Sequence, residues 1–77
     1  MKWKEHLNET KIREVWKEKM GTTINQYTKD MNFRKGKLFI SINSASLKQE
    51  LSYEKEKIVK MMNAELGGSY VTEVLIR

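Results

Sequence analysis

Apolar side chains in residues 12–27 recur every three or four positions, a spacing typical of one buried helix face. Asn8 precedes this stripe and suits an N-cap, because its side chain can accept hydrogen bonds from the free amides of a first turn. Gly21 interrupts the stripe at a cost of about 1 kcal/mol relative to alanine. The pattern predicts one helix over residues 9–27, with a bend available at residues 21–23. The apolar positions are Ile12, Val15, Trp16, Met20, Ile24 and Tyr27.

The next segment changes to an alternation of period two, which is typical of half-buried strands. Met31 and Phe33 fall on one side of a first strand, and residues 38, 40 and 42 fall on one side of a second. Lys35 and Gly36 lie between them, where a glycine suits the positive φ of a two-residue hairpin turn. The pattern predicts a β-hairpin on which Phe39 points away from the core.

After Asn43 the apolar period returns to that of a helix. Ser44 and Ser46 are both suitable N-caps for a short helix with Leu47 and Leu51 on its buried side. Residues 52–66 predict a second helix with Met61 and Met62 in the core, ended by two glycines. Residues 70–77 are rich in β-branched and aromatic side chains and predict a final strand.

These elements predict one α+β domain over residues 1–77, in the order α-β-β-α-α-β. If the two late helices run down and back, the last strand starts where the second strand ended. It would then pair beside the first strand, in a three-stranded mixed sheet with all helices on one face. This is the order of a type II KH-like domain. Residues 1–8 are expected to be either frayed or the remnant of a longer N-terminal segment.

The distribution of charge along the chain indicates where a partner could bind. The net charge is +5, with a balance of +2 in residues 1–20, +3 in residues 21–43 and zero in residues 44–77. The surplus is therefore concentrated around the predicted hairpin turn. A local surplus of this kind attracts a polyanion over about a Debye length, although a basic balance also serves solubility alone.

The inventory of reactive side chains argues against an enzyme. There is no cysteine, and His6 has no partner at metal-ligand spacing. No nucleophile–histidine–carboxylate set and no phosphate-binding loop is present, so we expect no catalytic residue, cofactor, metal or small-molecule substrate. No signal peptide or membrane-spanning run is evident, which predicts a cytoplasmic protein with no membrane partner.

Three segments carry a family resemblance: residues 16–21 (WKEKMG), residues 27–28 (YT) and residues 35–40 (KGKLFI). With residues 44–51, Asn63, Gly67 and the ending Ile76-Arg77, they resemble the DciA-like family over residues 10–77. That family comprises bacterial replicative-helicase loader or operator proteins, long catalogued as a domain of unknown function. The resemblance implies a KH-like fold, DNA binding and contact with the replicative helicase.

The chain departs from the family and from KH domains in specific places. Family members often have a longer N-terminal segment and an extended C-terminal tail. If contact with the helicase needs either segment, we expect this chain to be either shortened or a short paralogue. A working KH domain clamps the nucleic-acid backbone with a Gly-x-x-Gly loop between two helices. Here that junction contains Glu50, Leu51, Ser52 and Tyr53 without a glycine. The usual KH clamp is therefore missing.

The candidate DNA-binding residues are the cations of the turn, Arg34, Lys35 and Lys37, followed by Lys29 and then by Arg13 and Lys17. Arg34 can fork onto a phosphate and the lysines act as point charges, but lysines also commonly protect a hairpin from edge pairing. Phe39 is a candidate for contact with a partner protein or a base. Trp16, Tyr27, Phe33, Met61 and Met62 are expected in the core.

We therefore predict a non-enzymatic module that binds DNA phosphates through the basic hairpin and docks on the replicative helicase. Single-stranded DNA is one option for the DNA partner. Two alternatives remain from the sequence: a protein–protein adaptor that uses Phe39 and the open sheet face, and an RNA-binding KH-like module. The missing glycine loop argues against the RNA-binding alternative.

Overall fold

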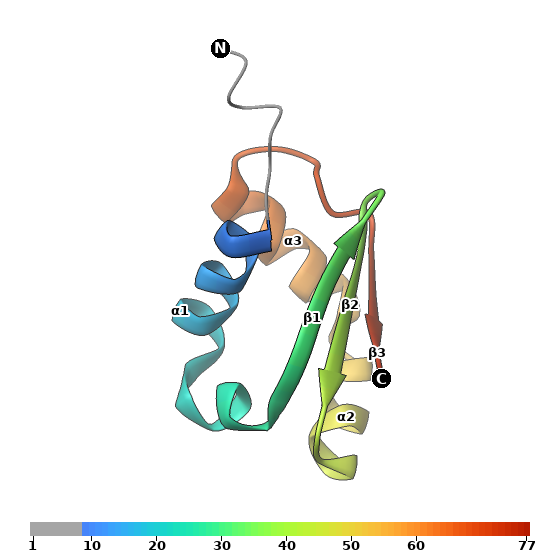
Figure 1. Cartoon of the computed structure of the whole chain (residues 1–77). Helices are drawn as coiled ribbons and strands as arrows, with labels where there is room; N and C mark the ends of the chain where they lie inside the picture. The colour runs from blue at the N-terminus through green and yellow to red at the C-terminus, as the bar shows by residue number, and fades with distance from the viewer. Residues whose placement is uncertain (1–8) are drawn as a thin grey trace.

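The computed structural model describes residues 9–77, which form three helices and a three-stranded mixed sheet (Figure 1). The predicted α+β class and the order α-β-β-α-α-β are confirmed. The predictions for residues 1–8, including the Asn8 cap, lie outside the described residues. The elements are α1 Glu9–Tyr27, β1 Thr28–Arg34, β2 Lys37–Ile42, α2 Ala45–Ser52, α3 Lys55–Leu66 and β3 Glu73–Ile76.

Helix α1 is kinked at Gly21, as the sequence predicts. Gly21 has φ 85° and ψ 173°, a conformation that breaks the helical hydrogen-bond ladder. The side-chain amide of Asn25 donates to the carbonyl of Gly21 at 2.6 Å and to the carbonyl of Lys17 at 3.2 Å. The Asn25 side chain thus satisfies two backbone carbonyls at the kink in α1.

The hairpin turn consists of Lys35 and Gly36, both with positive φ, at 48° and 84°. Positive φ at both central residues is the signature of a turn whose twist matches the flanking strands. The Gly36 carbonyl accepts hydrogen bonds from the Thr72 amide at 2.7 Å and from the Thr72 hydroxyl at 3.1 Å. The tip of the hairpin is therefore fixed to the segment that leads into β3.

The predicted strand order is wrong. Strand β3 lies beside β2 and parallel to it, with Lys37 opposite Glu73 and Ile40 opposite Ile76, so the order is β1-β2-β3. The short helix α2 stays at the end where β2 finishes, and α3 alone returns along the sheet (Figure 1). The 12 residues of α3 span about 18 Å, which suffices to bring the chain back to the start of β2.

Two element boundaries also differ from prediction. The first turn of α3 begins at Lys55 and not at Ser52, because the Ser52 hydroxyl donates to the Lys48 carbonyl at 2.8 Å and completes α2. Strand β3 begins at Glu73 and not at residue 70. Its shortening has a visible cause, since the Asn63 side chain donates to the Val71 carbonyl at 2.9 Å and accepts from the Val71 amide at 2.8 Å.

The core lies between the helices and the inner face of the sheet. Trp16 is 1% exposed, and its ring nitrogen donates to the Thr28 hydroxyl at 3.0 Å. Met62 is buried, whereas Phe33 and Met61 are half-buried and pack against the core. Tyr27 was expected in the core and is instead 41% exposed, at the end of α1. The buried side chains of the sheet are Met31, Leu38, Ile40, Ile42 and Val74.

Candidate nucleic-acid interface

The face of the sheet opposite the helices, here called the outer face, carries a mixed polar and apolar surface. Strand register places Arg34 opposite Lys37, Asn32 opposite Phe39, and Asp30 opposite Ser41. On the other side of β2, Phe39 lies opposite Leu75 and Lys37 opposite Glu73. Side chains opposite one another across a ladder share a face, so these residues form one continuous surface.

Three cations gather at one end of this surface: Arg34, Lys35 and Lys37, here called the turn cations. All three are exposed, and none forms an ion pair with another residue in the range 9–77. Arg34 and Lys37 are direct cross-strand partners, and like charges in that arrangement destabilise a pair of strands. The turn cations therefore repel one another, and a bound anion would relieve that repulsion.

The other predicted cations gather elsewhere, around a shallow depression of about 210 Å³ between α1 and β1. Its lining includes Arg13, Lys17 and Lys29. The structure thus places three of the six predicted DNA-binding residues at the turn and three beside α1, and Lys29 also borders a second depression, on the outer face.

Arg13 is already engaged within the protein. Its guanidinium donates to the Met31 carbonyl at 2.9 Å and lies 3.8 Å from Glu9 and 3.7 Å from Asp30. Glu9 in turn accepts from the Phe33 amide at 2.8 Å. These side chains hydrogen-bond the free edge of β1, so the main contacts of Arg13 are structural. Lys17 and Lys29 are exposed.

Phe39 lies on the outer face, as predicted, but it is half-buried and not fully exposed. The guanidinium carbon of Arg77 lies 4.6 Å from the centre of its ring, a distance that allows cation–π attraction. Arg77 follows β3, so this contact joins the central strand to the end of the chain's last strand.

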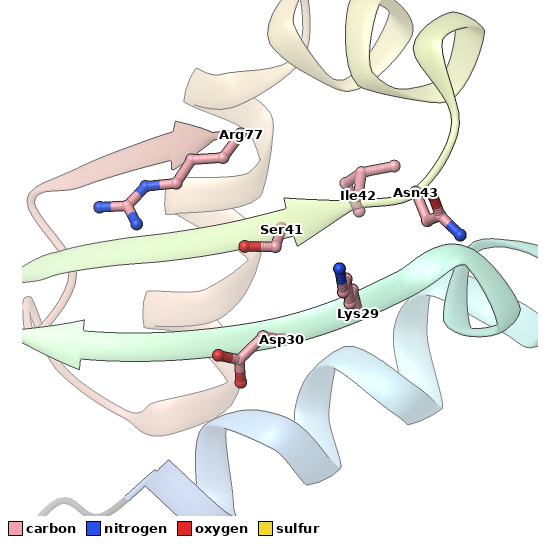
Figure 2. A pocket seen from close by; sticks show the side chains of 6 residues that line it. All are labelled: Lys29, Asp30, Ser41, Ile42, Asn43 and Arg77. Atoms are coloured by element: carbon pink, nitrogen blue, oxygen red, sulfur yellow. The ribbon is translucent and has the colours of Figure 1, made fainter.

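Arg77 also borders an open depression of about 510 Å³ on the outer face (Figure 2). Figure 2 shows Lys29 on β1, Ser41 on β2 and Arg77 beyond β3 around the hollow. Strands lie about 4.8 Å apart, so Lys29 and Arg77 are on strands separated by roughly 10 Å. The remaining lining residues are Asp30, Ile42 and Asn43.

Sequence reasoning missed Arg77 as a candidate binding residue, and it did not anticipate the exposure of Tyr53. The sequence did carry a signal for Arg77, because positions 73, 75 and 77 alternate with the core positions 74 and 76. Tyr53 is 80% exposed and belongs to the two-residue turn between α2 and α3. No apolar periodicity marks it, and the turn it occupies contains no glycine.

Within residues 9–77, no group of three or more histidine, aspartate and glutamate side chains is placed to hold a metal ion. None of the helices there combines the length and apolar character that crossing a bilayer requires.

The chain matches a protein-family model described as "Dna[CI] antecedent, DciA" over residues 1–76. The chain belongs to the DciA family. No curated protein and no solved structure matches it significantly. The DciA family is one of helicase loaders and adaptors and is not a known catalytic family.

Membership in the DciA family gives the chain a helicase-loader-like role in DNA replication, which implies interaction with the replicative helicase. The resemblance noted in the sequence is thereby confirmed.

Proposed function

We propose that this chain holds DNA through its turn cations while it interacts with the replicative helicase. The observation that carries the proposal is the direct pairing of Arg34 with Lys37 next to Lys35. Three exposed cations without ion-pair partners among the described residues converge on one two-residue turn. A phosphate group would replace repulsion between them with charge-assisted hydrogen bonds.

The geometry of the turn supports this role. Lys35 is held at positive φ by the turn, and Gly36 is anchored to Thr72 by two hydrogen bonds. A fixed backbone lowers the entropy lost when the cations order around a phosphate. Contacts of this kind position a strand but carry no sequence information, so we expect binding without base preference from the turn itself.

A salt titration of DNA affinity tests the proposal. Replacement of Arg34, Lys35 and Lys37 by glutamine should weaken binding to all sequences alike. It should also reduce the slope of log K against log salt by about 2, because each phosphate contact on a single strand contributes about 0.7. Fluorescence anisotropy at several salt concentrations gives both quantities.

A matched variant controls for bulk charge. Replacement of Lys55, Lys57 and Lys60 on α3 by glutamine removes the same three charges from exposed positions away from the turn. An equal loss of affinity in the two variants would assign binding to net charge and reject the turn as the site. Capture of the purified replicative helicase should be the same for both variants, because the proposal separates helicase contact from the turn cations.

A further inference from the structure

The outer face offers a second kind of contact beyond phosphate binding, centred on Phe39. This ring is the only aromatic side chain among the outward-facing residues of the paired strands in the range 9–77, and it lies on the central strand. Asn32 and Leu75 flank it on the neighbouring strands, and the Arg77 guanidinium lies over its ring. Phe39 is thus a half-buried apolar platform in the middle of the mixed polar and apolar outer face.

Arg77 adds a second planar group to this platform. Its guanidinium carbon lies 4.6 Å from the Phe39 ring centre. Both aromatic rings and arginine guanidinium planes stack on unpaired bases in single-stranded nucleic acids. The pair therefore presents stacking surface together with a positive charge that can reach a neighbouring phosphate.

The charges around Phe39 favour an anionic occupant. Four cations border the outer face, at Lys29, Arg34, Lys37 and Arg77, against the two acids Asp30 and Glu73. Asp30 is already offset by Arg13 at 3.7 Å. An uncharged protein strand would gain nothing from this surplus, whereas a phosphate backbone carries a negative charge at every nucleotide and is attracted along the whole face.

The spacing suits a short stretch of single strand. Lys37 begins β2, and the depression lined by Ser41 lies at its other end. Four residues of strand correspond to about 13 Å. Sheet-face nucleic-acid modules stack two or three bases over comparable aromatic platforms. The turn cations, the Phe39–Arg77 pair and the Lys29–Arg77 depression thus follow one another along β2.

We infer that the outer face binds single-stranded DNA, with one base stacked on the Phe39–Arg77 pair and the backbone running from the turn cations toward the depression bordered by Lys29. This inference rests on the proposed DNA-binding function and adds a preference for unpaired bases. A paired base in a duplex keeps its faces stacked on its neighbours and is not available to the ring.

The decisive experiment compares three DNA probes on the full chain by fluorescence anisotropy. The probes are an oligothymidine of about 12 nucleotides, within the range that single-strand binders cover, an abasic strand of the same length, and a duplex of the same length. Stacking of one base is worth about 1–3 kcal/mol, which is roughly a 5- to 150-fold difference in Kd. We expect oligothymidine to bind more tightly than the abasic strand by a factor in that range.

Variants of Phe39 test whether the ratio of affinities for oligothymidine and the abasic strand depends on the Phe39 ring. Phe39→Leu should bring the ratio of the two affinities close to one without weakening abasic binding, and Phe39→Tyr should retain the wild-type ratio. Tyr53→Leu removes an exposed aromatic ring outside the sheet and should leave both affinities unchanged. Circular dichroism establishes whether each variant is folded. If Phe39→Leu does not fold, Phe39→Tyr still tests whether an aromatic ring at this position maintains the ratio of affinities.

Several outcomes would overturn the inference. Equal affinity of the wild type for oligothymidine and the abasic strand rules out stacking. If Phe39→Leu lowers the affinity for oligothymidine and for the abasic strand equally, the ring has a structural role. If Phe39→Leu abolishes helicase capture and leaves DNA affinity unchanged, the ring is a contact for the partner protein. Failure of the proposed function looks different, because glutamine at the turn cations would then leave both affinities intact while the dependence on bases remained.

Discussion

The two faces of strand β2 have different environments, because one lies in the core and the other forms the surface proposed to bind DNA. On the inner face Leu38 and Ile40 are fully buried and Ile42 is 4% exposed. On the outer face Lys37 is exposed, and Phe39 and Ser41 are half-buried. The alternation of one strand thus places the centre of the core directly behind the proposed DNA-binding surface. Substitutions one residue apart should therefore have very different consequences.

The largest expected effect is on the inner face, from Ile40→Ala. Truncation of a fully buried isoleucine costs about 2–5 kcal/mol, since both transfer energy and a cavity contribute. A chain of 77 residues has a total stability of only about 4–12 kcal/mol. Urea denaturation should show a much lower midpoint with an unchanged m-value. A loss below 1 kcal/mol would mean that the inner face of β2 is not the centre of the core.

A smaller effect is expected at the turn that opens β2, from Gly36→Ala. A Cβ at this position would lie 2.8 Å from the Thr72 hydroxyl oxygen, and φ is already positive at 84°. Strain from the positive φ and the close approach should together cost about 1–3 kcal/mol. Thermal unfolding monitored by circular dichroism measures the loss.

Gly67→Ala provides the matched control for this turn. Gly67 has a similar φ of 79°, but an added Cβ would meet no atom within 4 Å. It should therefore show the conformational cost alone, about 1 kcal/mol. Equal losses at the two glycines would show that the close approach of Thr72 adds no cost to a Cβ at the turn.

The smallest expected effect is on the outer face, from Ser41→Ala. Ser41 is half-buried at the edge of the open depression. Surface substitutions of this kind usually change stability by less than about 0.5 kcal/mol. The same denaturation measurement that is used for Ile40→Ala checks this. A loss comparable to that of Ile40→Ala would remove the distinction between the two faces.

Features that depend on neighbouring residues were predictable from the sequence. The kink at Gly21 and the turn at Lys35 and Gly36 follow from the conformational freedom of glycine. The inward side of each hairpin strand follows from the alternation of apolar residues. The turn cations were found for the same reason, because a two-residue turn brings Arg34 and Lys37 together without help from distant segments.

Features that depend on distant segments were not predictable in the same way. Alternation in the last strand identifies its buried side but not its neighbour, so the pairing of β3 with β2 was missed. The contact between Phe39 and Arg77 was missed with it, because it exists only in that strand order. Arg13 was treated as a surface cation, although its bond to the Met31 carbonyl makes it part of the β1 edge.

The large separation in sequence between β3 and the hairpin also bears on the order of folding. The hairpin joins residues that are close in sequence and can form within about 1–10 µs. The bond between Thr72 and Gly36 spans 36 positions, and closing so long a loop is entropically slower. We therefore expect β3 to join the sheet last during folding. A chain that has folded only as far as its hairpin already presents the turn cations, whereas the Phe39–Arg77 pair is complete only in the native state.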